Sequence, residues 1–176
     1  MLVIFAGLPG TGKTTLAREL ARELQAVYLR IDSIEQGIRN AEVVAGSLDD
    51  AGYRAAYAVA EDNLRLARDV VADSVNPWML TRDAWREVGL RAGVRTVEVE
   101  VVCSDAAEHR QRVESRVTDV PGLVLPDWQA VMKRDYHPWN RDHIAIDTAG
   151  TSIQQSLAQL RALLASRGGP ERDGPR

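Results

Sequence analysis

The segment 7–14, GLPGTGKT, combines three glycines with a lysine and two threonines at a spacing that suits the binding of phosphate groups. Glycine allows backbone conformations that a Cβ would forbid, so successive N–H groups can converge on one anion. In loops of this G-x-x-x-x-G-K-T type, the lysine ammonium reaches the β- and γ-phosphates and the last hydroxyl is a ligand of Mg²⁺. The pattern therefore predicts a nucleoside triphosphate site, with Lys13 as a catalytic residue and Thr14 as a metal ligand. The predicted nucleotide-binding residues are Gly7, Leu8, Pro9, Gly10, Thr11, Gly12, Lys13, Thr14 and Thr15.

Lysine is rare in this chain, which makes its place in the loop informative. Lys13 and Lys133 are the only lysines among 22 basic residues, so the chain otherwise uses arginine for positive charge. The alternative is a glycine-rich turn without a ligand, and the flanking residues argue against it. Residues 2–6 form an apolar run typical of a buried strand, and apolar residues recur at helical spacing after Lys13. The N-terminus of that helix would add its positive end to the loop.

The rest of the chain alternates short apolar runs with amphipathic segments. This alternation predicts an α/β fold with a five-stranded parallel sheet between helices, whose ligands lie at the carboxyl ends of the strands. We expect one domain at residues 1–166 and a disordered tail at 167–176, where glycine, proline and charge replace apolar periodicity. The predicted strands lie at 2–6, 26–31, 69–73, 96–103 and 143–147, and the predicted helices begin near 12, 48, 76, 104, 127 and 151.

Local signals refine these boundaries. Ser47 is placed to cap the helix at 48–68, with Asp50 completing a capping box. Asn76-Pro77 predicts the start of the next helix, because proline is well tolerated at the first helical position. Glu98 and Glu100 fall on one face of the fourth strand, which predicts that the early part of this strand is uncovered on that side.

Composition and charge narrow the possible functions. The formal net charge of −3 argues against a surface that binds polyanions, so nucleic acid is not the expected partner. The net charge does not exclude a local basic patch. Cys103 is the only cysteine, which excludes an intrachain disulfide or a multi-cysteine metal site. The three histidines lack metal-ligand spacing, so Mg²⁺ is the only metal expected. No apolar run reaches the length of a membrane span. We expect a cytoplasmic protein without membrane contact, and its oligomeric state stays open.

Three of the five predicted strands end in an aspartate, at Asp32, Asp73 and Asp147. A carboxylate beside a triphosphate is costly unless it holds the metal or accepts a proton. Phosphoryl transfer needs a group that orients an acceptor hydroxyl and takes its proton, and Asp32 is placed for that role. Asp73 could hold the metal or help to place the acceptor. The alternative, that these residues only cap helices and turns, is favoured for Asp147.

The segment EHRQRVESR supplies the positive charge that transfer requires. On a helix, Arg112 and Arg116 lie one turn apart on the same face. The glycine- and proline-containing loop 117–126 follows, and we expect residues 110–126 to form a lid over the phosphates. The alternative is a solvated helix face, on which Glu108 pairs with Arg112 and Asp105 with His109.

Taken together, these motifs resemble the small P-loop kinases. The opening MLVIFAGLPGTGKTTLAREL, then RID, VVADSVN and HRQRVESR, is similar to the zeta-toxin-like and chloramphenicol-phosphotransferase-like group, which is AAA-type and related to polynucleotide kinases. The resemblance implies an adenylate-kinase-like sheet in the order 2-3-1-4-5, Mg-ATP as donor and a hydroxyl-bearing acceptor. It assigns the base to Asp32 and phosphate contacts to Arg112 and Arg116. It also implies that the turn from Asp73 to Asn76 lines the acceptor pocket or the metal.

One departure from this family bears on the acceptor. Polynucleotide kinases of this type tend to carry an arginine three residues after the base, where this chain has Glu35 and its nearest arginine is Arg39. This favours a neutral or cationic small molecule, with Glu35 or Glu42 facing a positive group and Arg39 among the substrate contacts.

Tryptophans offer a second indication of where substrates bind. Trp78 could line the acceptor pocket, and Trp139, in the segment 136–139, could do the same or flank the adenine. Trp85 is predicted to be a core residue that packs with Leu80 and Val88.

The leading hypothesis is therefore an ATP-dependent phosphotransferase that acts on a small-molecule hydroxyl. A kinase of polynucleotide ends or of nucleotides is the first alternative. A nucleotide-binding switch or accessory ATPase that transfers no phosphoryl group is the second.

Overall fold

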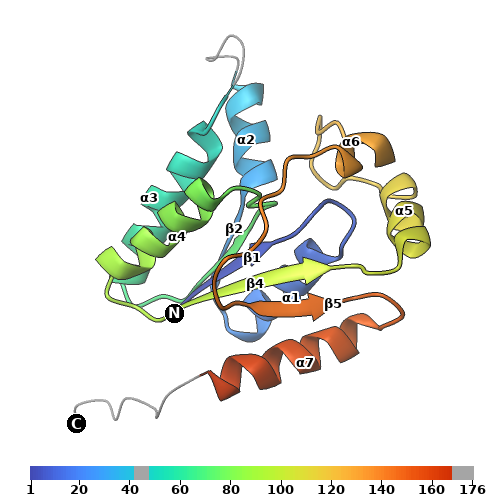
Figure 1. Ribbon diagram of the computed structural model, residues 1–176. Coiled ribbons are helices and arrows are strands. Elements are labelled where there is room, and N and C mark those ends of the chain that lie inside the picture. The colour runs from blue at the N-terminus through green and yellow to red at the C-terminus, as the bar shows by residue number, and fades with distance from the viewer. Residues whose placement is uncertain (42–47, 168–176) are drawn as a thin grey trace.

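The structure is a computed structural model that describes residues 1–41 and 48–167. Strands and helices alternate along the described chain, and the strands form a single twisted sheet between layers of helices (Figure 1). The strands are β1 (Leu2–Ala6), β2 (Val27–Arg30), β3 (Val70–Asp73), β4 (Thr96–Val102) and β5 (Ile144–Asp147). The helices are α1 (Lys13–Glu23), α2 (Ile31–Asn40), α3 (Ala51–Arg65), α4 (Met79–Arg91), α5 (Ala106–Glu114), α6 (Trp128–Met132) and α7 (Ile153–Ser166).

The five strands are parallel and lie in the order β2-β3-β1-β4-β5, which confirms the predicted topology. The register aligns Asp73 at the end of β3 with Phe5 on β1 and with Arg30 on β2. The carboxyl ends of these three strands therefore lie side by side, and the loops that follow them share one edge of the sheet.

Alternating side chains of β1 face two separate apolar cores. Val3 and Phe5 pack with residues of α1 and α7, whereas Leu2 and Ile4 pack with residues of α3 and α4. Figure 1 shows α7 below the sheet, with α2, α3 and α4 grouped on the other side. Because helices cover both faces, β1 is apolar at every position rather than at alternate ones.

Several predicted helix starts differ from the observed ones. Helix α4 begins at Met79 rather than at Asn76-Pro77, because the left-handed φ of 47° at Asn76 belongs to a turn. Helix α3 begins at Ala51, and the side chain of Asp50 pairs with Arg54 instead of making a capping hydrogen bond. Ser47 and the tail after residue 167 lie outside the described residues.

The prediction that one face of β4 is uncovered is wrong. Glu98 is 7 % exposed, and both of its oxygens accept hydrogen bonds of 2.8 Å from Arg141. Glu100 accepts a hydrogen bond of 2.9 Å from the Tyr136 hydroxyl, so the segment before β5 covers this face. Ion pairing with Arg141 of that segment explains why Glu98 tolerates a buried position, whereas Glu100 is only partly buried.

The tryptophan prediction is correct for one of the two proposed neighbours. Trp85 is fully buried in the α3–α4 core together with Val88, whereas Leu80 is 78 % exposed. Within residues 1–41 and 48–167, no helix is both long and apolar enough to cross a bilayer.

Candidate nucleotide-binding and phosphoryl-transfer site

The loop between β1 and α1 has the backbone geometry of a phosphate cradle. Gly7, Gly10 and Gly12 have φ values of 140°, 87° and 90°. A Cβ at Gly7 would lie 2.3 Å from the Val101 carbonyl oxygen, and one at Gly10 would lie 2.5 Å from Val113 Cγ2. Gly7 and Gly10 are therefore required both for the backbone conformation and for the close approach of β4 and α5, and Gly12 for the conformation alone. Helix α1 begins directly after the loop, so its free N–H groups face the same space.

Side chains from distant parts of the chain hold this loop in place. His109 of α5 lies with Nε2 2.9 Å from the Pro9 carbonyl oxygen, which can only accept, so Nε2 carries the proton of this hydrogen bond. The Thr148 hydroxyl, just after β5, lies 2.8 Å from the Thr11 carbonyl oxygen and donates to it. The loop is thus fixed by α5 and by the turn after β5 before any ligand binds.

A cavity of about 350 Å³ opens beside the loop and is dominated by positive charge. Lys13 is only 7 % exposed, and burial lowers the pKa of its ammonium against the opposing charges of Asp73 and Asp32. Burial also lowers the pKa of Arg116, whose Nη1 is buried without a partner among the described residues. Such a cavity is suited to a polyphosphate. It is lined by Gly10, Gly12, Lys13, Thr14, Thr15, Arg18, Arg30, Arg112, Arg116, Val117 and Asp119.

Arg112 combines features of both interpretations offered by the sequence. It pairs with Glu108, as on a solvated helix face, and it also donates hydrogen bonds of 2.7 and 2.9 Å to the hydroxyl and carbonyl oxygens of Thr148. The expected pairing of Asp105 with His109 is absent from the described contacts, because Asp105 caps α5 and His109 binds the phosphate loop. Arg112 is therefore held in place at the wall of the cavity.

A second cavity of about 290 Å³ adjoins the first and shares Gly12, Thr15 and Arg112 with it. Its other walls come from α1, from the turn after β5 and from the first residues of α7. These additional residues are Leu16, Thr148, Thr151, Ile153 and Ser156. The cavity extends from the phosphate loop towards a partly apolar surface, as a nucleoside requires. Trp139 lines neither cavity and instead stacks on His143 and Arg82.

The strand-end aspartates occupy different environments. Asp73 is 2 % exposed, and its Oδ2 accepts a hydrogen bond of 2.7 Å from the Tyr28 hydroxyl, while Oδ1 is buried without a partner in the described part of the chain. Asp32 lies in the first turn of α2, half-buried, with Oδ2 3.7 Å from Arg30 Nη2. Asp147 accepts hydrogen bonds from the backbone of Ser104 and Ala149, which agrees with a role in a turn.

The turn after β3 holds polar groups that lack partners. Asn76 is fully buried, yet both atoms of its side-chain amide, and Ser74 Oγ, have no hydrogen-bond partner within residues 1–41 and 48–167. The backbone N–H of Asn76 donates to the Tyr53 hydroxyl. Glu35 lies close enough to Tyr53 for its charge to act on that residue. Burial raises the pKa of Glu35, and the nearby charge of Asp32 adds to the shift. Buried polar groups without partners are costly, which is why they are typical of sites that bind polar ligands.

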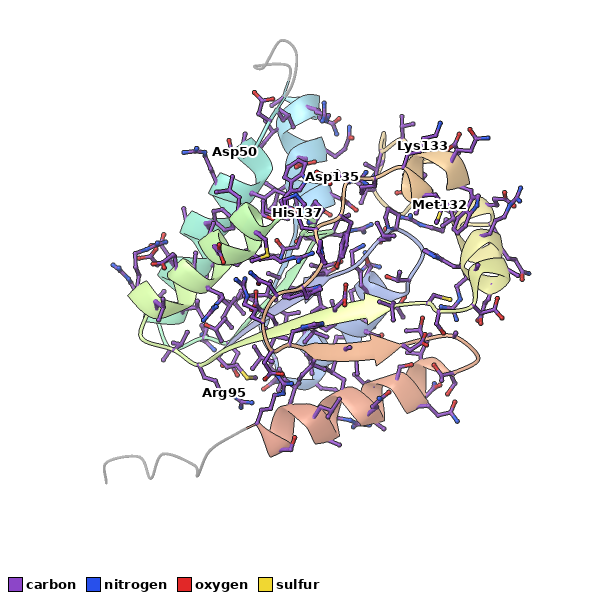
Figure 2. All side chains as sticks on the ribbon, viewed as in Figure 1. Asp50, Arg95, Met132, Lys133, Asp135 and His137 are labelled. Carbon is purple, nitrogen blue, oxygen red and sulfur yellow. The ribbon has the colours of Figure 1, made fainter. Side chains whose placement is uncertain are left out.

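Two residues predicted to contact the substrate, Arg39 and Trp78, lie outside the two cavities beside the phosphate loop. Arg39 is exposed near the end of α2. Trp78 is 45 % exposed, and its Nε1 donates to Asp135, which Figure 2 labels between α4 and α6.

Sequence reasoning missed several residues that build the site. Arg30 carried a detectable signal, because it is a charged residue at the end of an apolar strand. Thr148 carried one too, because it directly follows the predicted strand at 143–147. His109 and Asp119 carried none, since their roles depend on contacts between segments far apart in the chain. Arg82 was also missed. It is fully buried between Tyr136 and Trp139 and binds the carbonyl oxygens of Asn76, Pro77, His137 and Pro138.

Comparison with known sequences places this site in a family. A family model of the AAA domain, AAA_33, matches residues 2–134. The "Probable adenylyl-sulfate kinase" of Aeropyrum pernix is 24 % identical over 93 % of this chain and 92 % of its own length. An uncharacterized protein of Mycobacterium tuberculosis is 30 % identical over 85 % of this chain, which spans only 32 % of that longer protein.

Solved structures show the same fold. Kti12 of Chaetomium thermophilum, in complex with ADP-AlF3, has a TM-score of 0.71 at 20 % identity, covering 96 % of this chain and 100 % of that one. The Mycobacterium tuberculosis APS kinase, in complex with AMPPNP and APS, has a TM-score of 0.66 at 22 % identity, covering 93 % and 96 %. These findings confirm the resemblance inferred from the motifs: the chain belongs to the AAA domain family and has the fold of the P-loop kinases.

Proposed function

We propose that this protein transfers the γ-phosphoryl group of Mg-ATP to a hydroxyl group of a small molecule. The observation that carries the proposal is a cationic phosphate cavity with two carboxylates nearby. Asp32 lies 3.7 Å from Arg30, which lines the cavity, and Asp73 is close enough for its charge to act on Lys13. Burial lowers the pKa of both Lys13 and Arg116, and the negative charges of Asp73 and Asp32 act in the opposite direction on both groups. Binding of a Mg-nucleotide accounts for one carboxylate beside the phosphates, as a metal ligand. Transfer to a hydroxyl also needs a second group that accepts the proton, and the second carboxylate could supply it.

The cations and the two cavities suggest where the nucleotide would lie. The triphosphate would occupy the larger cavity, with its β- and γ-phosphates against the loop N–H groups and Lys13. Arg112 and Arg116 would stabilise the negative charge on the migrating group, as the proposed lid of residues 110–126 requires. The nucleoside would then extend into the second cavity, past Arg112 towards Ile153.

Asp32 is the proposed base. The acceptor oxygen attacks the γ-phosphorus and its proton passes to the Asp32 carboxylate. The bond from the γ-phosphorus to the bridging oxygen breaks at the same time, and its electron pair leaves with ADP. Asp32 is half-buried on the first turn of α2, one helical turn before Glu35, so a hydroxyl group can reach its exposed part.

The residues present fit a magnesium ion. The unpartnered Oδ1 of Asp73 and the Thr14 hydroxyl are oxygen donors of the kind Mg²⁺ prefers. The bound ion would neutralise charge on the phosphates. The Tyr28 hydroxyl donates to the other oxygen of Asp73, so Oδ1 is the oxygen left for a metal ion.

The acceptor is proposed to be neutral or cationic. Asp32, Glu35 and Asp73 are acidic, and Tyr53 and Asn76 add neutral hydrogen-bonding groups to the same region. Arg39 and Trp78 would contact only the outer part of such a molecule, since both are largely exposed. Glu42, the other acidic residue considered for a positive substituent, lies outside the described residues.

A panel of acceptors incubated with γ-labelled ATP tests this function. The panel holds amino sugars, aminoalcohols, sugar acids, nucleosides and short 5′-hydroxyl oligonucleotides. We expect label in a neutral or cationic small molecule, and less of it with Glu35→Gln when that molecule is cationic. Label in an oligonucleotide or nucleoside would favour the first alternative, and tight ATP binding without labelled product would favour a non-transferring switch.

A further inference from the structure

One carboxylate intrudes into the otherwise cationic phosphate cavity. Asp119 belongs to the loop 117–126, which we call the strap, and its two oxygens are taken by two different arginines. Oδ2 pairs with Arg18 of α1, and Oδ1 lies 2.7 Å from Nη1 of Arg30 at the end of β2. Hydrogen bonds from Arg30 and Arg18 lower the pKa of the Asp119 carboxyl, so it is charged wherever the protein is folded near neutral pH. A single side chain thus ties the strap to α1 and β2.

The strap has a defined path across the top of the site. It leaves the end of α5 beside the cavity, at Val117, and reaches α2, where Gly122 lies so close to Gln36 that a Cβ would be 2.9 Å from Nε2. Val120 is buried, and its N–H donates to the Thr118 hydroxyl. Asp119 therefore lies in an ordered turn. Its ion pairs hold the strap, which begins after α5, against Arg18 of α1 and Arg30 of β2.

Arg30 connects Asp119 of the strap with Asp32, the proposed base. It is 7 % exposed, and its guanidinium lies between two carboxylates: Nη1 hydrogen bonds to Asp119, whereas Nη2 is 3.7 Å from Asp32, too far for a hydrogen bond. A buried guanidinium needs a charged partner. If Asp119 moved away with the strap, Asp32 would be the nearest carboxylate, and a fork-shaped guanidinium readily binds a carboxylate through both oxygens.

We propose that Asp119 is a positioning residue that couples closure of the strap to the availability of Asp32. With the strap closed, Asp119 satisfies Arg30 and Arg18, and the Asp32 carboxylate is left to accept the proton of the acceptor hydroxyl. With the strap open, Arg30 binds Asp32 and occupies the lone pairs that would take that proton. The base is then available only when the site is covered, which limits transfer of the phosphoryl group to water.

The part of this inference that concerns the strap stands by itself, while the part that concerns Asp32 rests on the proposed phosphotransferase activity. The experiment therefore has two independent readouts. The variants are Asp119→Asn, which removes the charge, and Asp119→Glu, which keeps it. The matched control is Glu114→Gln, which removes a carboxylate three residues before the strap. Among the described residues, Glu114 pairs only with exposed Arg110.

The first readout is hydrogen exchange of the strap amides together with the dissociation rate of a fluorescent ADP analogue. We expect Asp119→Asn to raise both by about tenfold, since a lost charge-assisted hydrogen bond at a partly exposed site has that effect. We expect Asp119→Glu to raise them less and Glu114→Gln to leave them unchanged. Equal strap exchange in the wild type and Asp119→Asn would overturn the role of Asp119 in closure.

The second readout is the kinetics of transfer to the acceptor found with labelled ATP. We expect Asp119→Asn to lower kcat about tenfold or more, with a smaller change in the KM for ATP. Adding Arg30→Gln to Asp119→Asn should restore part of kcat, because the glutamine lacks the charge that captures Asp32. A double variant as slow as Asp119→Asn, with an unchanged Tm, would overturn the coupling. A wild type that labels no acceptor would overturn the proposed function and this coupling with it, while leaving the strap readout decisive for closure.

Discussion

Replacing Lys13 by methionine should separate two effects of its buried charge, which are a lower stability of the nucleotide-free protein and a stronger binding of nucleotide. Lys13 is almost completely buried, and burial lowers its pKa, so the folded protein holds a cation that its surroundings do not fully compensate. Methionine has a similar length and no charge. Lys13→Met is therefore expected to weaken nucleotide binding while leaving the nucleotide-free protein as stable as the wild type or more so, by about 1 kcal/mol.

The magnitude of the nucleotide effect follows from mass action. Mg-ATP at 100 times its Kd would stabilise the wild type by about 2.7 kcal/mol. In a chain of 176 residues each kcal/mol shifts Tm by about 2–4 °C, so ATP should raise Tm by about 5–10 °C. Thermal unfolding with and without Mg-ATP measures both effects, and we expect this rise to be lost in Lys13→Met.

The chain supplies its own control in its only other lysine. Lys133, labelled in Figure 2 on the outer end of α6, is exposed, and we expect Lys133→Met to keep the full ATP-induced rise in Tm. A Lys13→Met protein that kept this rise, or that was much less stable than the wild type without nucleotide, would refute the reasoning.

The pH dependence has a definite sign. Burial lowers the pKa of Lys13 in the folded protein below its ordinary value of 10.5. At pH values between the lowered pKa and 10.5, the Lys13 amine is therefore protonated more often in the unfolded chain than in the folded one. The stability of the wild type relative to Lys13→Met should therefore rise with pH through this interval, and chemical denaturation of both proteins at neutral and alkaline pH would reveal it.

Three further predictions concern the supports of the site. Gly7→Ala should lower the free energy of unfolding by about 1–3 kcal/mol, because its Cβ would meet the Val101 carbonyl oxygen, whereas Gly37→Ala, with open space around it, should raise it by about 0.5–1 kcal/mol. Urea denaturation compares the two. Arg82→Met should cost at least about 3 kcal/mol in the same assay, since it strands four carbonyl acceptors, and a smaller loss would mean that water replaces the guanidinium. Thr148→Val should weaken ATP binding about tenfold in calorimetric titration and lower the free energy of unfolding by about 1–3 kcal/mol, because the Thr11 carbonyl loses its donor. Unchanged affinity would contradict its role in holding the phosphate loop.

The sequence was sufficient for the fold and for the phosphate loop. Alternation of apolar strands with helices gave the parallel sheet, and a contiguous motif on one loop needs no long-range information to be read. Boundaries near the site were less predictable. Asn76-Pro77 looked like a helix start because proline suits that position, yet Arg82 holds the carbonyl oxygens of both residues in a turn.

Residues brought together by tertiary contacts could not be predicted. Glu98 looked solvent-facing because nothing in the sequence indicated that Arg141 would bind both of its oxygens. The pairing of Arg30 with Asp119 joins positions far apart in the chain, and no local pattern encodes it. The roles assigned to Asp32, Asp73 and Arg116 stay predictions, supported by their position around Lys13.

The most direct test of the central claim is the rate of phosphoryl transfer in Asp32→Asn, measured with labelled ATP and the acceptor found in the panel. General base catalysis predicts a loss of about 10²–10⁴-fold in kcat, with the Kd for ATP changed less than about twofold. Asp147→Asn, which alters a strand-end carboxylate held in a turn, should retain transfer. Transfer by Asp32→Asn at the wild-type rate would contradict the account and move the role of base to another residue.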